Sequence, residues 1–220
     1  YEASGEVNQF SSKYDAFLVG DADLSVEEAR GLALFEGKAR CSACHPTGTG
    51  SFFTDFTYDN LGVPRNPENP FYDMDTELLG DGTPINPLGR GWVDPGLGGF
   101  LETRPEYQVQ AAANMGKHKV PTLRNVGKGS SKAYGHNGYF KSLKGVVHFY
   151  NTRDTKPACP DTFTTEEDAL QLSCWPIPEV AANVNIAELG NLGLTEAEED
   201  AIVAFMLTLS DELKVKKKTK

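Results

Sequence analysis

Hydrophobic residues recur at helical spacing in three parts of this chain. Two of these parts begin with a capping box, in which a Ser or Thr is followed by Glu three residues later, at Ser25 and at Thr195. The third part covers residues 142–151, and its apolar side chains are Leu143, Val146, Val147 and Tyr150. We therefore predict a helix that follows Ser25 and ends near Gly37, a short amphipathic helix over 142–151, and a further helix after Thr195.

The stretch between residues 46 and 113 has little periodicity. It is rich in Gly, Pro, Asn and Asp, which indicates ordered loop with short helical turns. Loops of this length inside a compact domain are usually functional or cover a cofactor. Strand signal is weak throughout, so the expected fold is mainly α, with 46–113 as a loop-rich insertion.

Charge and length narrow the classes of function. The chain has 220 residues, 39% of them hydrophobic, which is enough for one core or a core with a large insertion. Its net charge of −10 argues against nucleic acid as a partner, because phosphate binding requires a basic face. The sequence contains no apolar run of about 20 residues, so we expect no membrane span.

The most specific motif is C-x-x-C-H, formed by Cys41, Cys44 and His45. This pattern is typical of c-type haem attachment, in which two thiols tether the porphyrin and the adjacent imidazole becomes the proximal iron ligand. A zinc site would need a second ligand pair at ordinary spacing, and a thioredoxin-like motif would need a βαβ context; neither is found. We therefore predict one covalent haem c.

The motif also completes the prediction of the fold. A helix before C-x-x-C-H and an amphipathic helix near the C-terminus are what a class I cytochrome c fold needs. We divide the chain into a linking segment at 1–24, a cytochrome c domain at 25–213 that contains the 46–113 insertion, and a basic tail at 214–220.

Two further cysteines, Cys159 and Cys174, lie beside prolines. Covalent haem attachment implies the periplasm or another oxidising, extracytoplasmic compartment, where disulfides persist. We predict that the two cysteines form a disulfide worth about 3 kcal/mol in the chain-entropy model. Two free buried thiols are the alternative.

Three further segments carry a family resemblance. Residues 119–126 read K-V-P-T-L-R-N-V, residues 134–143 read Y-G-H-N-G-Y-F-K-S-L, and residues 146–151 read V-V-H-F-Y-N. With G-L-A-L-F at 31–35, they make the chain resemble the bacterial di-haem cytochrome c peroxidase/MauG family, from about residue 10 to 211. The similarity is to the C-terminal half of that family, which holds the electron-transfer haem.

The resemblance implies haem c electron transfer as part of a di-haem protein. Family members carry a second C-x-x-C-H in an N-terminal domain, where peroxide reacts, whereas this chain has one motif. Peroxidase activity is therefore expected only within a larger di-haem protein. The alternative is a stand-alone mono-haem periplasmic electron carrier. In either case we expect a redox partner protein, such as a small cytochrome or a cupredoxin-type donor. If the chain is part of a di-haem protein, a second haem domain is a further expected partner.

The resemblance also suggests the other site residues. Aligning His136 with the family's H-D-G places Tyr150 where family members carry an axial Met or Tyr, although Tyr150 equally suits a core position. Met115, in a loop after the motif, is the rival sixth ligand, and the sequence leaves both open. Arg124 is the candidate partner of a haem propionate, with a surface ion pair as the alternative. His136 is expected near the haem, in a hydrogen bond.

Calcium stays open as a second cofactor. The family's inter-haem calcium uses main-chain carbonyls in the segment after L-R-N-V, but here that segment, 127–133, is two residues longer and lacks the usual Pro. The acidic residues Asp73, Asp75 and Glu77 have no EF-hand pattern and suit a solvated turn. His118 and His148 are expected at the surface.

Overall fold

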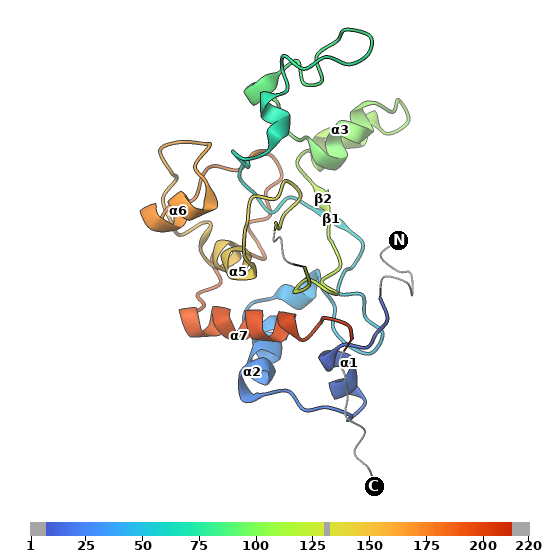
Figure 1. The fold of residues 1–220 in the computed structure, drawn as a ribbon, viewed down its shortest axis with the longest axis vertical. Helices are drawn as coiled ribbons and strands as arrows, with labels where there is room; N and C mark the ends of the chain where they lie inside the picture. The colour runs from blue at the N-terminus through green and yellow to red at the C-terminus, as the bar shows by residue number, and fades with distance from the viewer. Residues whose placement is uncertain (1–7, 130–132, 213–220) are drawn as a thin grey trace.

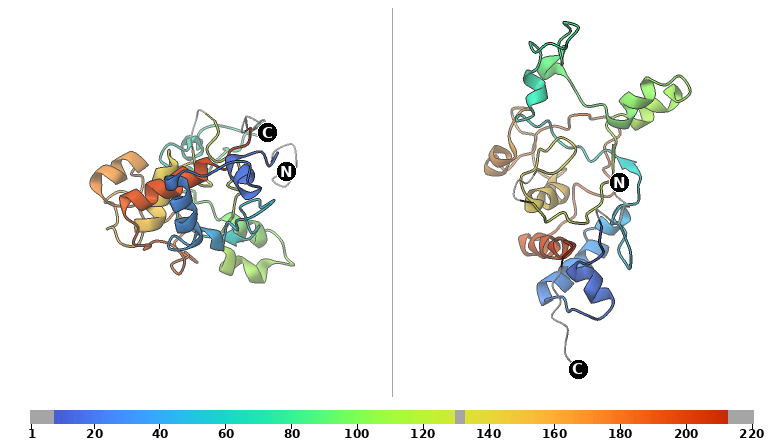
Figure 2. Two further views of the ribbon diagram at one scale, coloured as in Figure 1. Left: turned by 90° about the horizontal axis from the view of Figure 1, so that it is seen from below. Right: turned by 45° about the vertical axis from the view of Figure 1, so that its right-hand side comes forward.

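The computed structural model describes residues 8–129 and 133–212. Three helices form its centre: α2 (Val26–Glu36), α5 (Leu143–Thr152) and α7 (Glu196–Leu207). Helix α7 lies between the other two and contacts both (Figures 1 and 2). These are the three helices that the hydrophobic pattern predicts.

Local capping explains where the central helices begin. The Ser25 hydroxyl accepts a hydrogen bond from Glu28 N at 3.2 Å, and the Glu28 carboxylate accepts one from Ser25 N at 2.6 Å. Thr195 and Glu198 make the same reciprocal pair at 3.3 and 2.8 Å. Each box satisfies two backbone donors that a helix start leaves unpaired, so both predicted capping boxes are confirmed.

The core between α2 and α7 is aromatic. Phe35 and Phe205 pack edge to face with ring centroids 5.2 Å apart, and Tyr14 meets Phe205 in the same way at 5.4 Å. Tyr14 belongs to α1 (Lys13–Leu18), so part of the predicted linking segment is folded into this core. Residues 1–7 and the predicted basic tail, 214–220, lie outside the described residues.

Residues 46–113, the predicted insertion, consist of loop with short elements. In Figure 1 much of it extends away from the three central helices, at the top of the view. Strands β1 (Tyr58–Asp59) and β2 (His118–Lys119) pair antiparallel, with Asp59 opposite His118. The other elements between α2 and α5 are η1 (Cys41–Ala43), η2 (Pro70–Asp73), η3 (Gly89–Gly91), α3 (Gly96–Glu102), α4 (Gln108–Ala111) and η4 (Ala112–Asn114).

A second buried cluster lies around the segment between α5 and α7. Cys159 and Cys174 form a disulfide with Cα atoms 5.1 Å apart, which confirms the predicted pairing. The disulfide joins the two ends of a segment that contains α6 (Glu166–Leu172). Its neighbours Phe149 and Trp175 pack edge to face, so the disulfide closes this segment and apolar contacts hold it to α5. No helix among the described residues is long and apolar enough to cross a membrane.

Candidate haem site

A cavity of about 430 Å³ opens between η1, α5, α7 and the segment after β2. Its walls are mostly apolar, and this volume falls in the range of small-molecule and cofactor sites, about 300–1,000 Å³. Cys41, Cys44, His45 and Tyr150 all line it. The structure therefore brings the whole C-x-x-C-H motif to one apolar space of cofactor size.

One tight turn presents the motif to this cavity. Helix α2 ends at Gly37, and the chain enters η1, where His45 N donates to Cys41 O at 2.9 Å. Burial raises the pKa of Cys41 to about 12 and that of Cys44 to about 11, the latter with help from nearby carboxylates. Neither cysteine forms a disulfide, so both thiols are free for the thioether bonds of a haem c.

His45 is held in one tautomer by the backbone. Its Nδ1 lies 2.7 Å from the carbonyl oxygen of Phe53, and a carbonyl can only accept, so Nδ1 carries the proton. Burial lowers the pKa of His45 and keeps the imidazole neutral. The lone pair of Nε2 is thus left for a metal, which is the usual arrangement of an imidazole ligand. No motif in the sequence indicates this role of Phe53.

The rival sixth ligands lie in different places. Tyr150, on α5, lines the cavity, and burial raises the pKa of its phenol. Met206, on α7, is buried and also lines it. Met115 does not belong to the lining among the described residues; it packs against α3, where a Cβ on Gly98 would lie 2.7 Å from its Sδ.

Arg124 is buried rather than part of a surface ion pair. Its Nη1 donates to Asp15 at 2.6 Å and its Nε to the carbonyl of Ser51 at 2.8 Å. The guanidinium also lies over the ring of Phe10, 4.5 Å from the centroid. Its Nη2 is buried and has no partner among the described residues, so one donor of this side chain stays available to a further acceptor. Arg124 itself does not line the cavity, although the adjacent Leu123 does.

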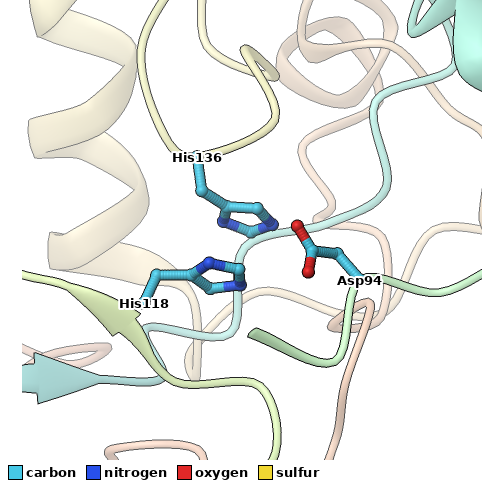
Figure 3. A group of neighbouring side chains, drawn as sticks. All are labelled: Asp94, His118 and His136. Atoms are coloured by element: carbon cyan, nitrogen blue, oxygen red, sulfur yellow. The ribbon is translucent and has the colours of Figure 1, made fainter. Parts of the chain in front are cut away.

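His136 lines the cavity and interacts with a buried carboxylate. Its Nε2 lies 3.4 Å from Oε2 of Glu179, a side chain that is only 2% exposed. The ring of His118 stacks on that of His136, with centroids 3.5 Å apart and planes inclined by 6° (Figure 3). The expectation that His118 is a surface residue is therefore wrong, because β2 turns it inward to a half-buried position on the cavity wall.

The acidic residues considered as calcium ligands do not form a cluster among the described residues. Asp73 pairs with Arg90 at 3.1 Å, and in the described part of the chain Asp73, Asp75 and Glu77 do not bring their carboxylates together as a metal-binding group. Residues 130–132, in the segment considered for an inter-haem calcium, lie outside the described residues.

Comparison with known proteins shows similarity to MauG and to di-haem peroxidases. No protein-family model matches the chain. The methylamine utilization protein MauG of Paracoccus denitrificans is 34% identical over 217 residues, which are 96% of this chain and 49% of MauG. Cytochrome-c peroxidase IdrP1 of Denitromonas iodatirespirans is 32% identical over 204 residues, 90% of this chain and 44% of IdrP1.

A solved structure gives the same relationship. The crystal structure of the diheme peroxidase BthA from Burkholderia thailandensis matches with a TM-score of 0.67 and 29% identity, covering 94% of this chain and 48% of BthA. The chain thus spans about half the length of the relatives it matches. It belongs to the family of MauG and the di-haem cytochrome c peroxidases and is a haem c protein with a mainly α, cytochrome c-like fold.

Proposed function

We propose that this chain is the electron-transfer haem unit of a MauG-like or di-haem peroxidase protein. It holds one haem c, tethered through Cys41 and Cys44, with His45 as proximal ligand. The observation that carries the proposal is the shared cavity, since the three residues of the motif and Tyr150 line one apolar space. When bound, the haem supplies a one-electron iron couple.

The residues of the chain perform the supporting chemistry. The Phe53 carbonyl, 2.7 Å from Nδ1 of His45, fixes the imidazole so that Nε2 faces the cavity. The mostly apolar walls would limit the access of water to a bound haem. Arg124 remains our candidate for a propionate, because its buried Nη2 has no acceptor in the part of the chain that the structure describes.

We propose Tyr150 as the sixth ligand. It lines the same cavity as the motif, whereas Met115 packs against α3. A phenolate is a hard donor that stabilises ferric iron, and the metal itself would displace the proton that burial otherwise holds on the phenol. Met206 is the second sulfur candidate because it also lines the cavity.

Three variants of the holoprotein test this assignment: Tyr150→Phe, Met206→Leu and Met115→Leu. We expect Tyr150→Phe alone to change the ferric optical and EPR spectra, while Met115→Leu leaves both unchanged. Loss of a thioether-type red-edge band in either Met variant would instead identify sulfur ligation and a conventional high-potential cytochrome. Intact mass and a pyridine haemochrome assay should give one haem, and a mass without one added haem would contradict the proposal.

The partners follow from this role. We infer that a second haem domain carries the peroxide chemistry and that a small cytochrome or cupredoxin-type protein exchanges electrons with this chain. The net charge of −10 favours docking on a basic patch. An extracytoplasmic location agrees with the Cys159–Cys174 disulfide. Stopped-flow reduction of the chain by a basic small cytochrome should slow as salt is added, and the chain alone should not turn over hydrogen peroxide.

A further inference from the structure

A second group of ligand-type side chains lies beside the haem cavity. One ligand atom each from Asp94, His118 and His136 can be chosen so that all three lie within 4.8 Å of one another. Figure 3 shows the two imidazole rings face to face, with the Asp94 carboxylate directed at their edges. The three residues come from distant parts of the sequence: the turn before α3, strand β2, and the loop before α5.

We propose that Asp94, His118 and His136 form a binding site for a divalent transition-metal ion, separate from the haem iron. Two imidazole nitrogens and one carboxylate oxygen suit zinc, copper or ferrous iron rather than calcium or magnesium. Tetrahedral zinc with bonds of about 2.1 Å holds its ligand atoms about 3.4 Å apart, so metal binding requires the two stacked imidazole planes to turn toward a common point.

The carboxylates around the group are fixed by the fold. Asp94 accepts a hydrogen bond from Gly96 N at 2.9 Å through Oδ1. Glu179 accepts from the Tyr72 hydroxyl at 2.9 Å and from Asp94 N at 3.2 Å, and its other oxygen lies 3.4 Å from Nε2 of His136. Glu179 is thus positioned to orient the His136 ring or to add a second carboxylate, as the surroundings of metal-bound imidazoles usually do.

Gly96 allows the turn to approach His118. It has a φ of +56°, and a Cβ at this position would lie 2.4 Å from the carbonyl of Lys117 and 3.2 Å from Nε2 of His118. Any other residue would push the Asp94 turn away from strand β2.

The group is also distinct from the attachment motif. His118 and His136 line the cavity, but neither contacts the Cys41–His45 turn through any hydrogen bond or ring contact recorded for the described residues. An ion bound here would lie at the wall of the haem pocket without replacing an iron ligand. The site therefore does not depend on which residue is the sixth haem ligand.

The test uses the haem-loaded chain, stripped with chelator and titrated with zinc chloride in a calorimeter. We expect one zinc to bind, and Asp94→Asn and His118→Gln each to weaken it by at least about tenfold. His148→Gln is the matched control, because His148 hydrogen-bonds Glu199 at 2.9 Å and Lys156 at 2.8 Å, outside the group. Haem content, measured on each sample, separates failure of this site from failure of haem binding.

A measurement on the unaltered protein keeps the result independent of variant folding. Zinc K-edge X-ray absorption, which is separate from the iron edge, should show two imidazoles in the coordination shell. Absence of zinc binding to the wild type, a shell with fewer than two imidazoles, or equal affinity in His118→Gln would overturn the proposal. The two histidines would then be a stacked pair in which His136 is held by Glu179.

Discussion

Gly31 is the residue on which the contact between α2 and α7 most directly depends. A Cβ at this position would lie 1.9 Å from the carbonyl oxygen of Ala201 and 2.8 Å from Cβ of Phe205. Both atoms belong to α7, and the closer one is backbone, so it cannot rotate away. In Gly31→Ala the two helices must therefore separate by about 1 Å before the contact reaches 3 Å.

The expected magnitude combines two effects of opposite sign. Overpacking a well-packed core costs about 1–3 kcal/mol, and a clash with backbone belongs at the upper end of that range. Alanine in a helix interior gains about 1 kcal/mol over glycine in propensity. The net loss of unfolding free energy should be about 2 kcal/mol, which lowers the Tm by roughly 4–8 °C for a domain of this size.

Urea and thermal unfolding of the holoprotein, followed by far-UV circular dichroism, measure this loss. Gly80→Ala is the matched control, because a Cβ there meets no atom within 4 Å and the residue does not need the left-handed region. We expect the control to match the wild type or exceed its stability by up to about 1 kcal/mol. If Gly31→Ala is as stable as Gly80→Ala, the close packing of α2 on α7 does not hold in solution.

Three other predictions concern stability. Replacing Cys159 and Cys174 together with Ala should cost about 3 kcal/mol in urea unfolding, since the bridge closes a 15-residue separation, and an unchanged midpoint would refute its role. Burial alone would raise the pKa of Asp15, but hydrogen bonds from Arg124 and Ser12 hold it below its ordinary value. The ion pair therefore stabilises the fold above the ordinary carboxylate pKa and is lost as pH falls through the lower, folded-state value. Asp15→Asn should lose about 3 kcal/mol at pH 7, because the Arg124 side chain is fully buried, and should flatten the acid end of a pH–stability profile. Burial raises the pKa of Glu166, so its ionised form destabilises the fold above the ordinary pKa. Glu166→Gln should then raise the Tm at pH 7 but not at pH 4, and a lower Tm at pH 7 would contradict this.

Local sequence rules account well for the helical part of the fold. The capping boxes at Ser25 and Thr195 act within four residues, so the sequence alone specifies where α2 and α7 begin. The disulfide can also be predicted from the sequence, because Cys159 and Cys174 are the two cysteines of the chain outside the haem motif. In each case few alternatives competed with the correct one.

The contacts that shape the site are long-range, and no local pattern contains them. The Phe53 carbonyl that orients His45 depends on the path of the loop between them. Asp59 pairs across β1 and β2 with His118, and this pairing turns the imidazole inward beside His136. Two-residue strands carry too little alternation to be recognised, so His118 looked like a surface residue in the sequence.

The sequence leaves two candidates for the sixth haem ligand, Tyr150 and Met115, and their packing in the structure differs. The spacing of the two residues along the chain allows either to reach the iron, because the path of the loop-rich segment 46–113 before them cannot be predicted from the sequence. In the structure, Met115 follows η4 and packs against Gly98 of α3, a contact that requires a glycine because a Cβ there would lie 2.6 Å from the Met115 backbone. Tyr150 is instead carried on α5, whose Leu143, Val146 and Val147 line the same cavity. Moving Met115 into the cavity would require the α3 contact to break, whereas Tyr150 already lines the cavity, so the packing of the insertion, more than the chemistry of the two donors, favours the phenol.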